Sequence, residues 1–165
     1  MKTLYVTYCS GRKHSISEGS PKHLYDSKRI RKFIEICESR RYDYAILSAK
    51  YGLFFADEVH ENYNVTFRSV AYDCRIVENE VLKSKDDSHK HFRFLVQQIR
   101  KLIQDNGFEK IIFYCRPPLK WRKCYLKALH AGADDCHIDH MKWDELLGHI
   151  REESKIRIVT VMKNL

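Results

Sequence analysis

The segment YAILSAKYGL, residues 44–53, begins as a buried β-strand and then changes to small and polar residues around a single lysine, Lys50. In α/β proteins the ligand-binding groups lie just past the carboxyl ends of parallel strands. A lysine in this place, between Ser48 and Gly52, is positioned to meet an anion or an electrophile. The alternative is an ordinary surface loop that happens to contain a lysine.

The first predicted strand, residues 2–8, ends in a similar way. It continues into the sequence CSGRKH, which contains Cys9, Ser10 and Lys13, and then into a loop rich in Ser, Gly and Pro. If the two strands are neighbours in one sheet, the loops that follow them lie at the same edge of that sheet. We therefore expect one site to be assembled from these two loops.

Strands and helices alternate along the rest of the chain. We expect strands at residues 2–8, 42–47, 110–115, 136–138 and 156–161, and helices at residues 22–41, 71–83, 89–106, 119–130 and 142–152. Residues 51–72 are interpreted as a long aromatic loop, and Ser88 as the N-cap of the helix ended by Gly107. This alternation is typical of the α/β class. We expect a single three-layer domain over residues 1–165, with a mostly parallel sheet and helices on both faces.

Size and composition favour a soluble, cytoplasmic protein. The sequence has no apolar stretch long enough to cross a membrane, and its first residues lack a signal-peptide pattern. The six cysteines show no CxxC spacing, so we expect reduced thiols. No cofactor is predicted, because the Gly-x-Gly-x-x-Gly and P-loop patterns are absent. No metal is predicted either; the alternative is a zinc ion held by residues 136–140 with Cys124 or His130.

The net charge of +8 predicts a polyanionic partner. The excess is concentrated in residues 116–127, which carry five positive charges and no acid, interleaved with Trp121 and Tyr125. Basic residues beside aromatic rings suit phosphates and unstacked bases. The alternative is a solvated helix whose Trp121 is turned into the core. In the first interpretation, the residues that contact a nucleic-acid backbone are Arg116, Lys120, Arg122, Lys123 and Lys127.

The order of the motifs resembles that of a known family. The motifs are Cys9-Ser10-x-x-Lys13, Leu24-Tyr25-x-Ser27, LSAKYGL at residues 47–53, Asp57, and Asn62-Tyr63. They are similar to the signature of a family of small uncharacterised prokaryotic and viral proteins. More distantly, residues 3–73 resemble the catalytic core of archaeosine synthase, which modifies a deazaguanine base in tRNA, although Tyr8 stands where that core usually has proline. The resemblance implies a fold of the uracil-DNA-glycosylase type and an activity on a base, with the substrate left open.

These residues fit an enzyme that processes a nucleobase or nucleoside, by modifying a base or acting at a glycosidic bond in tRNA or DNA. Lys13 and Lys50 would hold phosphate or polarise the reacting group, or act as nucleophiles if they are buried. Cys9 lies beside positive charge, which favours a thiolate. Asp57, expected close to Lys50, would transfer a proton.

Other residues of the motifs would bind the substrate. Ser10, Ser27, Ser48 and Gly52 would orient it, and Tyr25 and Tyr63 would sandwich the base. For Cys9 and for each tyrosine the alternative is a purely structural place in the core. A rival of a different class is a non-catalytic nucleic-acid-binding module, which needs residues 116–127 but neither Lys50 nor Asp57. A third possibility is an enzyme that acts on a free nucleotide.

Overall fold

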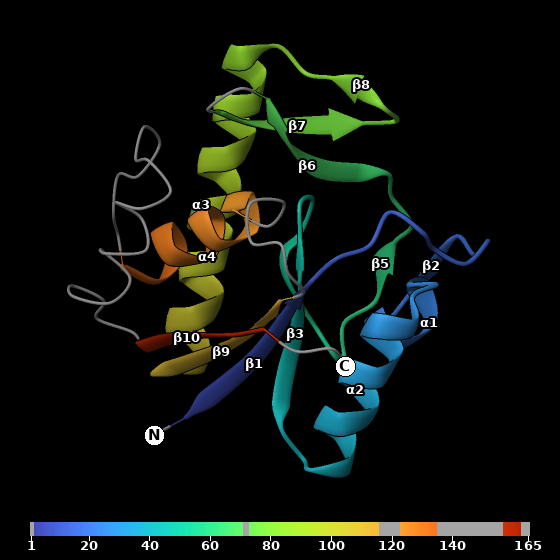
Figure 1. Ribbon diagram of the computed structural model, residues 1–165, viewed down its shortest axis with the longest axis vertical. Coiled ribbons are helices and arrows are strands. Elements are labelled where there is room, and N and C mark those ends of the chain that lie inside the picture. Colours follow the sequence, from blue (N-terminus) through green and yellow to red (C-terminus); the bar gives the residue numbers. More distant parts are fainter. Residues whose placement is uncertain (1, 71–72, 116–122, 135–156, 163–165) are drawn as a thin grey trace.

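The main sheet forms the centre of the computed structural model, which describes residues 2–70, 73–115, 123–134 and 157–162 (Figure 1). Within this part of the chain its strand order is β10-β9-β1-β3-β4. The strands are β1 (Thr3–Tyr8), β3 (Asp43–Ser48), β4 (Gly52–Phe55), β9 (Lys110–Cys115) and β10 (Arg157–Met162). Strands β10, β9, β1 and β3 run parallel, and β4 pairs antiparallel with β3. The predicted α/β class and the parallel pairing of these strands are confirmed.

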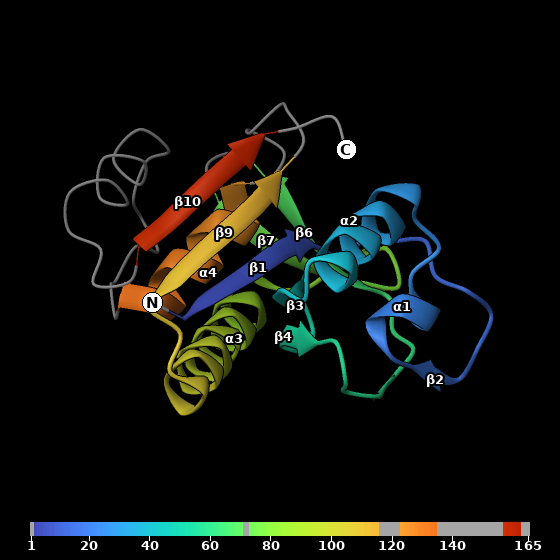
Figure 2. The same cartoon turned by 90° about the horizontal axis from the view of Figure 1, so that it is seen from below.

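The helices connect the parallel strands. They are α1 (Pro21–Leu24), α2 (Lys28–Ser39), α3 (Lys85–Asn106) and α4 (Lys123–Asp134). The single helix predicted over residues 22–41 is divided in two, because the backbone at Tyr25 is extended and Ser27 caps α2 by accepting a hydrogen bond from the Ile30 N–H. Helix α2 contacts β1 and β3, whereas α3 packs along α4 and against β4. Figure 2 shows α2 and the α3–α4 pair on different sides of β1.

Antiparallel strands account for most of the described residues between 52 and 82, so the long loop and the helix predicted there are wrong. The strands are β5 (His60–Glu61), which pairs with β2 (Glu18–Gly19), and a meander of β6 (Val65–Val70), β7 (Asp73–Glu78) and β8 (Val81–Leu82). Asn79 and Glu80 join β7 to β8 with positive φ angles of 49° and 67°. Two consecutive residues in this region make the tight turn that suits a hairpin.

Helix α3 begins four residues before the predicted start. Its N-cap is Ser84, whose side chain accepts a hydrogen bond from the Asp87 N–H. Ser88, the predicted cap, is buried inside the helix, and its Oγ accepts a hydrogen bond of 3.0 Å from the Ile76 N–H. This bond attaches α3 to β7. Gly107 ends the helix in the left-handed conformation, as predicted.

A disulfide between Cys74 and Cys124 joins β7 to α4. The expectation of reduced thiols is therefore wrong for this pair, which the packing of the meander against α4 brings to a Cα–Cα distance of 5.7 Å. Cys9 and Cys37 are free and buried. The strand expected at 136–138, the helix expected at 142–152 and the ligand-rich residues 136–140 lie outside the described residues.

The core lies between the main sheet and its helices. Its largest fully buried side chains include Phe33, Phe54 and Phe113. No described helix combines the length and the apolar composition that a membrane crossing requires.

Candidate functional site

The loops that follow β1 and β3 lie side by side, as the sequence predicts. Tyr8 pairs with Leu47 in the parallel register, and the Cys9 N–H donates a hydrogen bond of 3.0 Å to the Leu47 carbonyl. The segments CSGRKH and SAKYG therefore leave the sheet at the same edge. This is the edge at which parallel sheets bind their ligands.

A cleft of about 770 Å³ opens at the carboxyl end of β1. Residues 8–12 form one wall, the start of α2 (residues 26–29 and 31) a second, and residues 66, 67 and 125 of β6 and α4 the rest. We call it the β1 cleft. Three exposed cations line it, namely Arg12, Lys28 and Arg31. One acidic residue, Asp26, also lines it, and its carboxylate lies 3.5 Å from the Arg12 guanidinium. The cleft is therefore positively charged.

Arg29 has a different role from the other cations of the cleft, because it is buried. Its guanidinium donates hydrogen bonds of 2.6 Å to Thr7 Oγ1 and 2.7 Å to the Tyr8 carbonyl. Its Cζ also lies 3.6 Å from the centroid of the Tyr8 ring. Arg29 thus fixes the end of β1 from which Cys9 and Ser10 extend into the cleft.

Tyr25 and Tyr63 do not sandwich a base. Both are buried, their hydroxyls are hydrogen-bonded to each other, and their rings meet edge to face with an interplanar angle of 88°. Burial raises the pKa of both phenols well above the ordinary value. This expectation is wrong, because two core tyrosines joined at their hydroxyls leave no slot for a ring between them.

Lys13 lies against this tyrosine pair. Its Nζ donates a hydrogen bond of 3.0 Å to the Ser10 carbonyl and lies 4.2 Å from the centroid of the Tyr63 ring. The residue is half-buried, and desolvation lowers the pKa of its amine. Within the described ranges no carboxylate forms an ion pair with it.

Ser48 and Gly52 shape the turn that carries Lys50. The Ser48 Oγ accepts hydrogen bonds of 3.1 Å from the backbone N–H groups of Lys50 and Tyr51. Gly52 has a φ of +74°, and a Cβ there would lie 3.3 Å from Ile99 Cγ1. Both residues therefore have a structural reason for their identity, and the substrate-binding role predicted for them stays a prediction.

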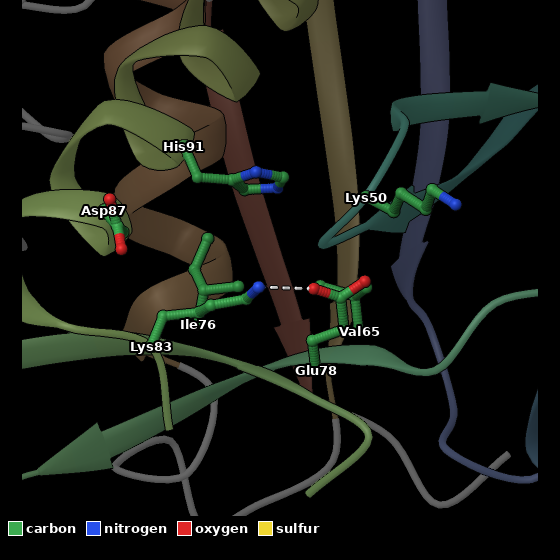
Figure 3. A pocket seen from close by; sticks show the side chains of 7 residues that line it. All are labelled: Lys50, Val65, Ile76, Glu78, Lys83, Asp87 and His91. Atoms are coloured by element: carbon green, nitrogen blue, oxygen red, sulfur yellow. Dashed lines mark ion pairs between the residues drawn. The ribbon is translucent and has the colours of Figure 1, made fainter. Parts of the chain in front are cut away.

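Lys50 lines a pocket that is separate from the β1 cleft. Its Nζ lies 5.3 Å from the centroid of the Tyr51 ring, which meets the Tyr63 ring edge to face. This pocket has a volume of about 220 Å³ and is lined by Lys50, Val65, Ile76, Glu78, Lys83, Asp87 and His91. Figure 3 shows the His91 ring on the side of Lys50 opposite the amine, which points away from the ring, and the Glu78–Lys83 ion pair, which measures 2.6 Å. The His91 Nε2 lies 3.0 Å from the Ala49 carbonyl and so carries the hydrogen of that bond. We call this the Lys50 pocket. The sequence analysis did not identify His91 and Glu78 as members of a site, because the segments that contain them carry no recognisable motif.

Asp57 lies at the opposite end of β3 from Lys50. Strand β4 pairs antiparallel with β3, so that Gly52 is opposite Ser48 and Phe55 is opposite Ala45. Asp57 follows β4 and lines a separate pocket of about 460 Å³ that also contains Asp43. The expectation that Asp57 pairs with Lys50 is wrong, because a hairpin carries the chain away from the lysine.

The basic segment is described only in part. Arg116, Lys120 and Arg122 lie outside the described residues, and Lys123 is half-buried at the start of α4. Lys127 is buried, with its Nζ 5.7 Å from the centroid of the Phe92 ring, so it is not the exposed backbone contact that we expected.

Three further side chains of the β1 cleft come from helices, namely Tyr125 of α4 and Lys28 and Arg31 of α2. Tyr125 brings its hydroxyl to 3.4 Å from the Cys9 Sγ. Lys28 and Arg31 were missed, since charged residues in an amphipathic helix are usually assigned to its solvated face. The signal that could have found them is their place in the first turn of α2, the helix that precedes β3. In the part of the chain that the structure describes, no group of three His, Cys, Asp or Glu side chains is placed to hold a metal ion.

The comparison with known families finds a match over most of the chain. The model of a family of unknown function (DUF6884) matches residues 4–131, a span that contains every residue lining the β1 cleft and the Lys50 pocket. No curated protein and no solved structure matches the chain.

Proposed function

The chain belongs to the DUF6884 family, whose function is unknown, and we propose that it is an enzyme that binds a nucleotide unit in the β1 cleft and acts on its base or its glycosidic bond. The observation that carries the proposal is the position of three exposed cations, Arg12, Lys28 and Arg31, at the carboxyl end of β1 and the first turn of α2. Phosphate groups bind at helix N-termini that follow parallel strands.

The phosphate of the nucleotide would lie at the start of α2. The N–H groups of a first helical turn carry partial positive charge, and Lys28 and Arg31 add full charges beside them. Arg12 reaches the same cleft from the loop after β1, and its ion pair with Asp26 is exposed to solvent and therefore weak. An incoming phosphate can replace that carboxylate and accept two parallel hydrogen bonds from the guanidinium.

The base would lie against the aromatic residues of the same cleft. Tyr8, Phe67 and Tyr125 all line it. The Tyr125 ring is 5.1 Å from Phe67 and 5.7 Å from Tyr8, centroid to centroid, so the three form one aromatic wall. Aromatic faces stack on unpaired bases. Tyr8 and Tyr125 are buried, and Arg29 covers the Tyr8 ring, so the half-buried Phe67 would be the ring of this wall that stacks on the base.

The reactive groups of this site would be the Cys9 thiol and the Lys13 amine. Cys9 lines the cleft, whereas Lys13 is not among the residues that line it; the Lys13 Nζ donates to the carbonyl of Ser10, which does line the cleft. Lys50 shares its pocket with His91 and Glu78, but its amine points away from the His91 ring (Figure 3) and Glu78 is paired with Lys83. The contribution of Lys50 to turnover therefore stays a prediction.

The proposal also covers the finer plan of the fold. We interpret the main sheet, with α2 and the α3–α4 pair on its two sides, as a three-layer arrangement of the uracil-DNA-glycosylase type. Together with the motif resemblance to the archaeosine synthase core, this plan supports an activity directed at a base, by analogy only. The cytoplasmic location remains a prediction of the same kind.

The experiment that tests the proposal is mass spectrometry of nucleosides digested from bulk tRNA and DNA. Cells that express the wild-type chain are compared with cells that express Cys9→Ser, Lys50→Ala or Lys101→Ala, the last an exposed lysine of α3 that serves as a control. We expect one nucleoside to change in abundance with the wild type and the control but not with Cys9→Ser. An unchanged profile in all strains, combined with oligonucleotide binding by the purified wild type, would instead support the non-catalytic binding module.

A further inference from the structure

The Cys74–Cys124 disulfide joins the meander to α4, and both of these elements carry side chains of the β1 cleft. We propose that this bond is a redox switch: a dithiol reductant that opens it releases the wall where Phe67 meets Tyr125 and uncovers the Cys9 thiol. The effect on a nucleotide ligand rests on the proposed function, whereas the uncovering of Cys9 rests only on the contacts around the disulfide.

Each cysteine of the bond lies close in the chain or in the sheet to a side chain of the cleft. Cys74 is opposite Ser69 of β6 in the antiparallel register, and Phe67, two residues earlier in β6, lines the cleft. Cys124 directly precedes Tyr125, which lines the cleft from α4. The Phe67 and Tyr125 rings meet edge to face, with centroids 5.1 Å apart. The disulfide therefore holds together the two elements whose rings meet in this wall.

The meander is a sheet of its own. Within the described residues, β6, β7 and β8 pair with one another and not with the main sheet. Strand β7 packs on α3, and its Ile76 N–H donates a hydrogen bond of 3.0 Å to the Ser88 Oγ of that helix. Strand β6 packs on α4. The disulfide adds a covalent restraint to this second contact, whereas the contact with α3 does not depend on it.

The two ends of α4 are held by different means. The last turn is attached to α3, because the Ala131 carbonyl accepts a hydrogen bond of 3.1 Å from the Arg100 guanidinium and Gly132 packs against Ile99. The first turn carries the disulfide and, next to it, Tyr125. Opening the bond therefore loosens the end of α4 that faces the cleft and leaves the other end in place.

Tyr125 covers Cys9. Its hydroxyl lies 3.4 Å from the Cys9 Sγ, and the two residues are only 7% and 4% exposed. A thiol reacts only where a reagent can reach its sulfur. Movement of Tyr125 with the first turn of α4 opens a path from the cleft to this thiol. The same movement removes the ring on which Phe67 packs, so the surface that stacks on a base is lost as well.

The chemistry of the switch is thiol–disulfide exchange. A thiolate of the dithiol attacks the sulfur of Cys74, which is the more exposed residue of the pair (9% against 3%). The sulfur–sulfur bond breaks, and Cys124 leaves as a thiolate that takes up a proton. The second thiolate of the reductant then attacks the reductant sulfur of the mixed disulfide and releases Cys74, which is also protonated. Two electrons and two protons pass to the protein, and the dithiol becomes a disulfide.

The localisation predicted for the chain fits a bond of this kind. In a reducing cytoplasm, disulfides are mostly transient, and those that form often sense the redox state. A bond between the meander and α4 in such a compartment reports that state to the cleft.

The first test is alkylation of the wild type by N-ethylmaleimide, before and after reduction by dithiothreitol at neutral pH. The reductant is removed before labelling, and each cysteine is located by peptide mapping. We expect the labelling rate of Cys9 to rise on the order of tenfold on reduction, since a buried thiol is labelled in proportion to the population of its open state. Cys37, which is free and buried in α2, is the internal control and should keep its rate.

Three results would overturn the proposal. The disulfide may stay closed in excess dithiothreitol, the rate at Cys9 may not change, or the rates at Cys9 and Cys37 may rise equally, which would mean that the whole molecule unfolds. None of these results depends on the folding of a variant. Cys74→Ala/Cys124→Ala serves as a second check, because its Cys9 should be labelled at the faster rate with or without the reductant.

A second arm separates the switch from the proposed function. The probes are a labelled single-stranded oligonucleotide and a strand of the same length whose bases are replaced by abasic sites. Reduction should weaken binding of the first probe on the order of tenfold, because stacking on Phe67 is lost, and should change binding of the second by less than about twofold. Faster labelling of Cys9 on reduction, with no binding of either probe to the oxidised protein, would support the switch and contradict the proposed function. Oligonucleotide binding that reduction leaves unchanged would overturn the control of the cleft by the disulfide.

Discussion

The guanidinium carbon of Arg29 lies 3.6 Å from the ring centroid of Tyr8, and both side chains are buried. Arg29 belongs to α2, whereas Tyr8 is the last residue of β1. The same guanidinium donates to the Tyr8 carbonyl and to Thr7 Oγ1. One cation therefore attaches the helix to the end of the strand, and the position of the residues that follow, Cys9 and Ser10, depends on it.

Replacing Arg29 by lysine should lower the free energy of unfolding by about 2 kcal/mol, because an ammonium cannot make both hydrogen bonds and stack on the ring, and buried acceptors are left without partners. Urea unfolding measures the change. The matched control is Arg31→Lys, the same substitution at an exposed residue of the same helix, which should change stability by less than about 0.5 kcal/mol. Similar losses in the two variants would mean that the buried contacts of Arg29 do not stabilise the fold.

Gly132 lets α4 approach α3. A Cβ at this position would lie 2.8 Å from the Ile99 Cβ, an atom next to the backbone that cannot move aside. Gly132→Ala should therefore destabilise the protein by about 1–3 kcal/mol, even though alanine favours helix. Gly11→Ala is the control, since a Cβ there has nothing within 4 Å. Thermal unfolding that shows no difference between the two variants would rule out a tight contact between the helices.

The disulfide between Cys74 and Cys124 closes a separation of 50 residues. Loop closure on this scale restricts the unfolded chain and should contribute about 4 kcal/mol to the free energy of unfolding. We expect a dithiol reductant to lower the Tm of the wild type and to leave the Tm of Cys74→Ala/Cys124→Ala unchanged. Peptide mapping without reduction checks the bond itself: recovery of Cys74 and Cys124 as separately alkylated thiols would show that it does not form.

Alkaline pH should destabilise the protein through Tyr25 and Tyr63. Burial raises the pKa of both phenols in the folded state. Their contribution to stability is therefore complete below the pKa of an unfolded tyrosine, about 10, and is lost as the pH rises through the folded values. Tyr25→Phe/Tyr63→Phe should show a smaller fall in unfolding free energy between about pH 9 and pH 11. A fall as steep as that of the wild type would assign the alkaline sensitivity to other groups.

The sequence predicted the parts of the site that depend on neighbouring parallel strands. Cys9 and Ser48 lie at one sheet edge because β1 and β3 are adjacent, and strand ends can be recognised from local patterns. The place of Asp57 depended instead on the direction of β4. A hairpin reverses the chain over a few residues, and the local sequence there predicts a loop.

The surroundings of Lys50 could not be predicted from local sequence. Glu78 and His91, which share its pocket, come from β7 and α3. The turn at Asn79 and Glu80, where the structure has a hairpin and the sequence predicts a helix, contains no glycine, the usual signal of a tight hairpin. The pairing of Tyr25 with Tyr63 likewise depends on tertiary packing, and so the sequence suggested a base-binding slot where the structure has a core contact.

The most direct test of the account is the affinity of a labelled single-stranded oligonucleotide, measured across a range of salt concentrations. Three proteins are compared: the wild type, Lys28→Ala/Arg31→Ala in the β1 cleft, and Lys32→Ala/Lys101→Ala, which removes the same charge from exposed residues outside it. If the cleft binds the phosphate, the first variant loses about 10- to 100-fold in affinity and its salt slope falls by roughly 2, while the second stays close to the wild type. Equal losses in both double variants would contradict the central claim, because they would mean that the oligonucleotide responds only to the overall charge.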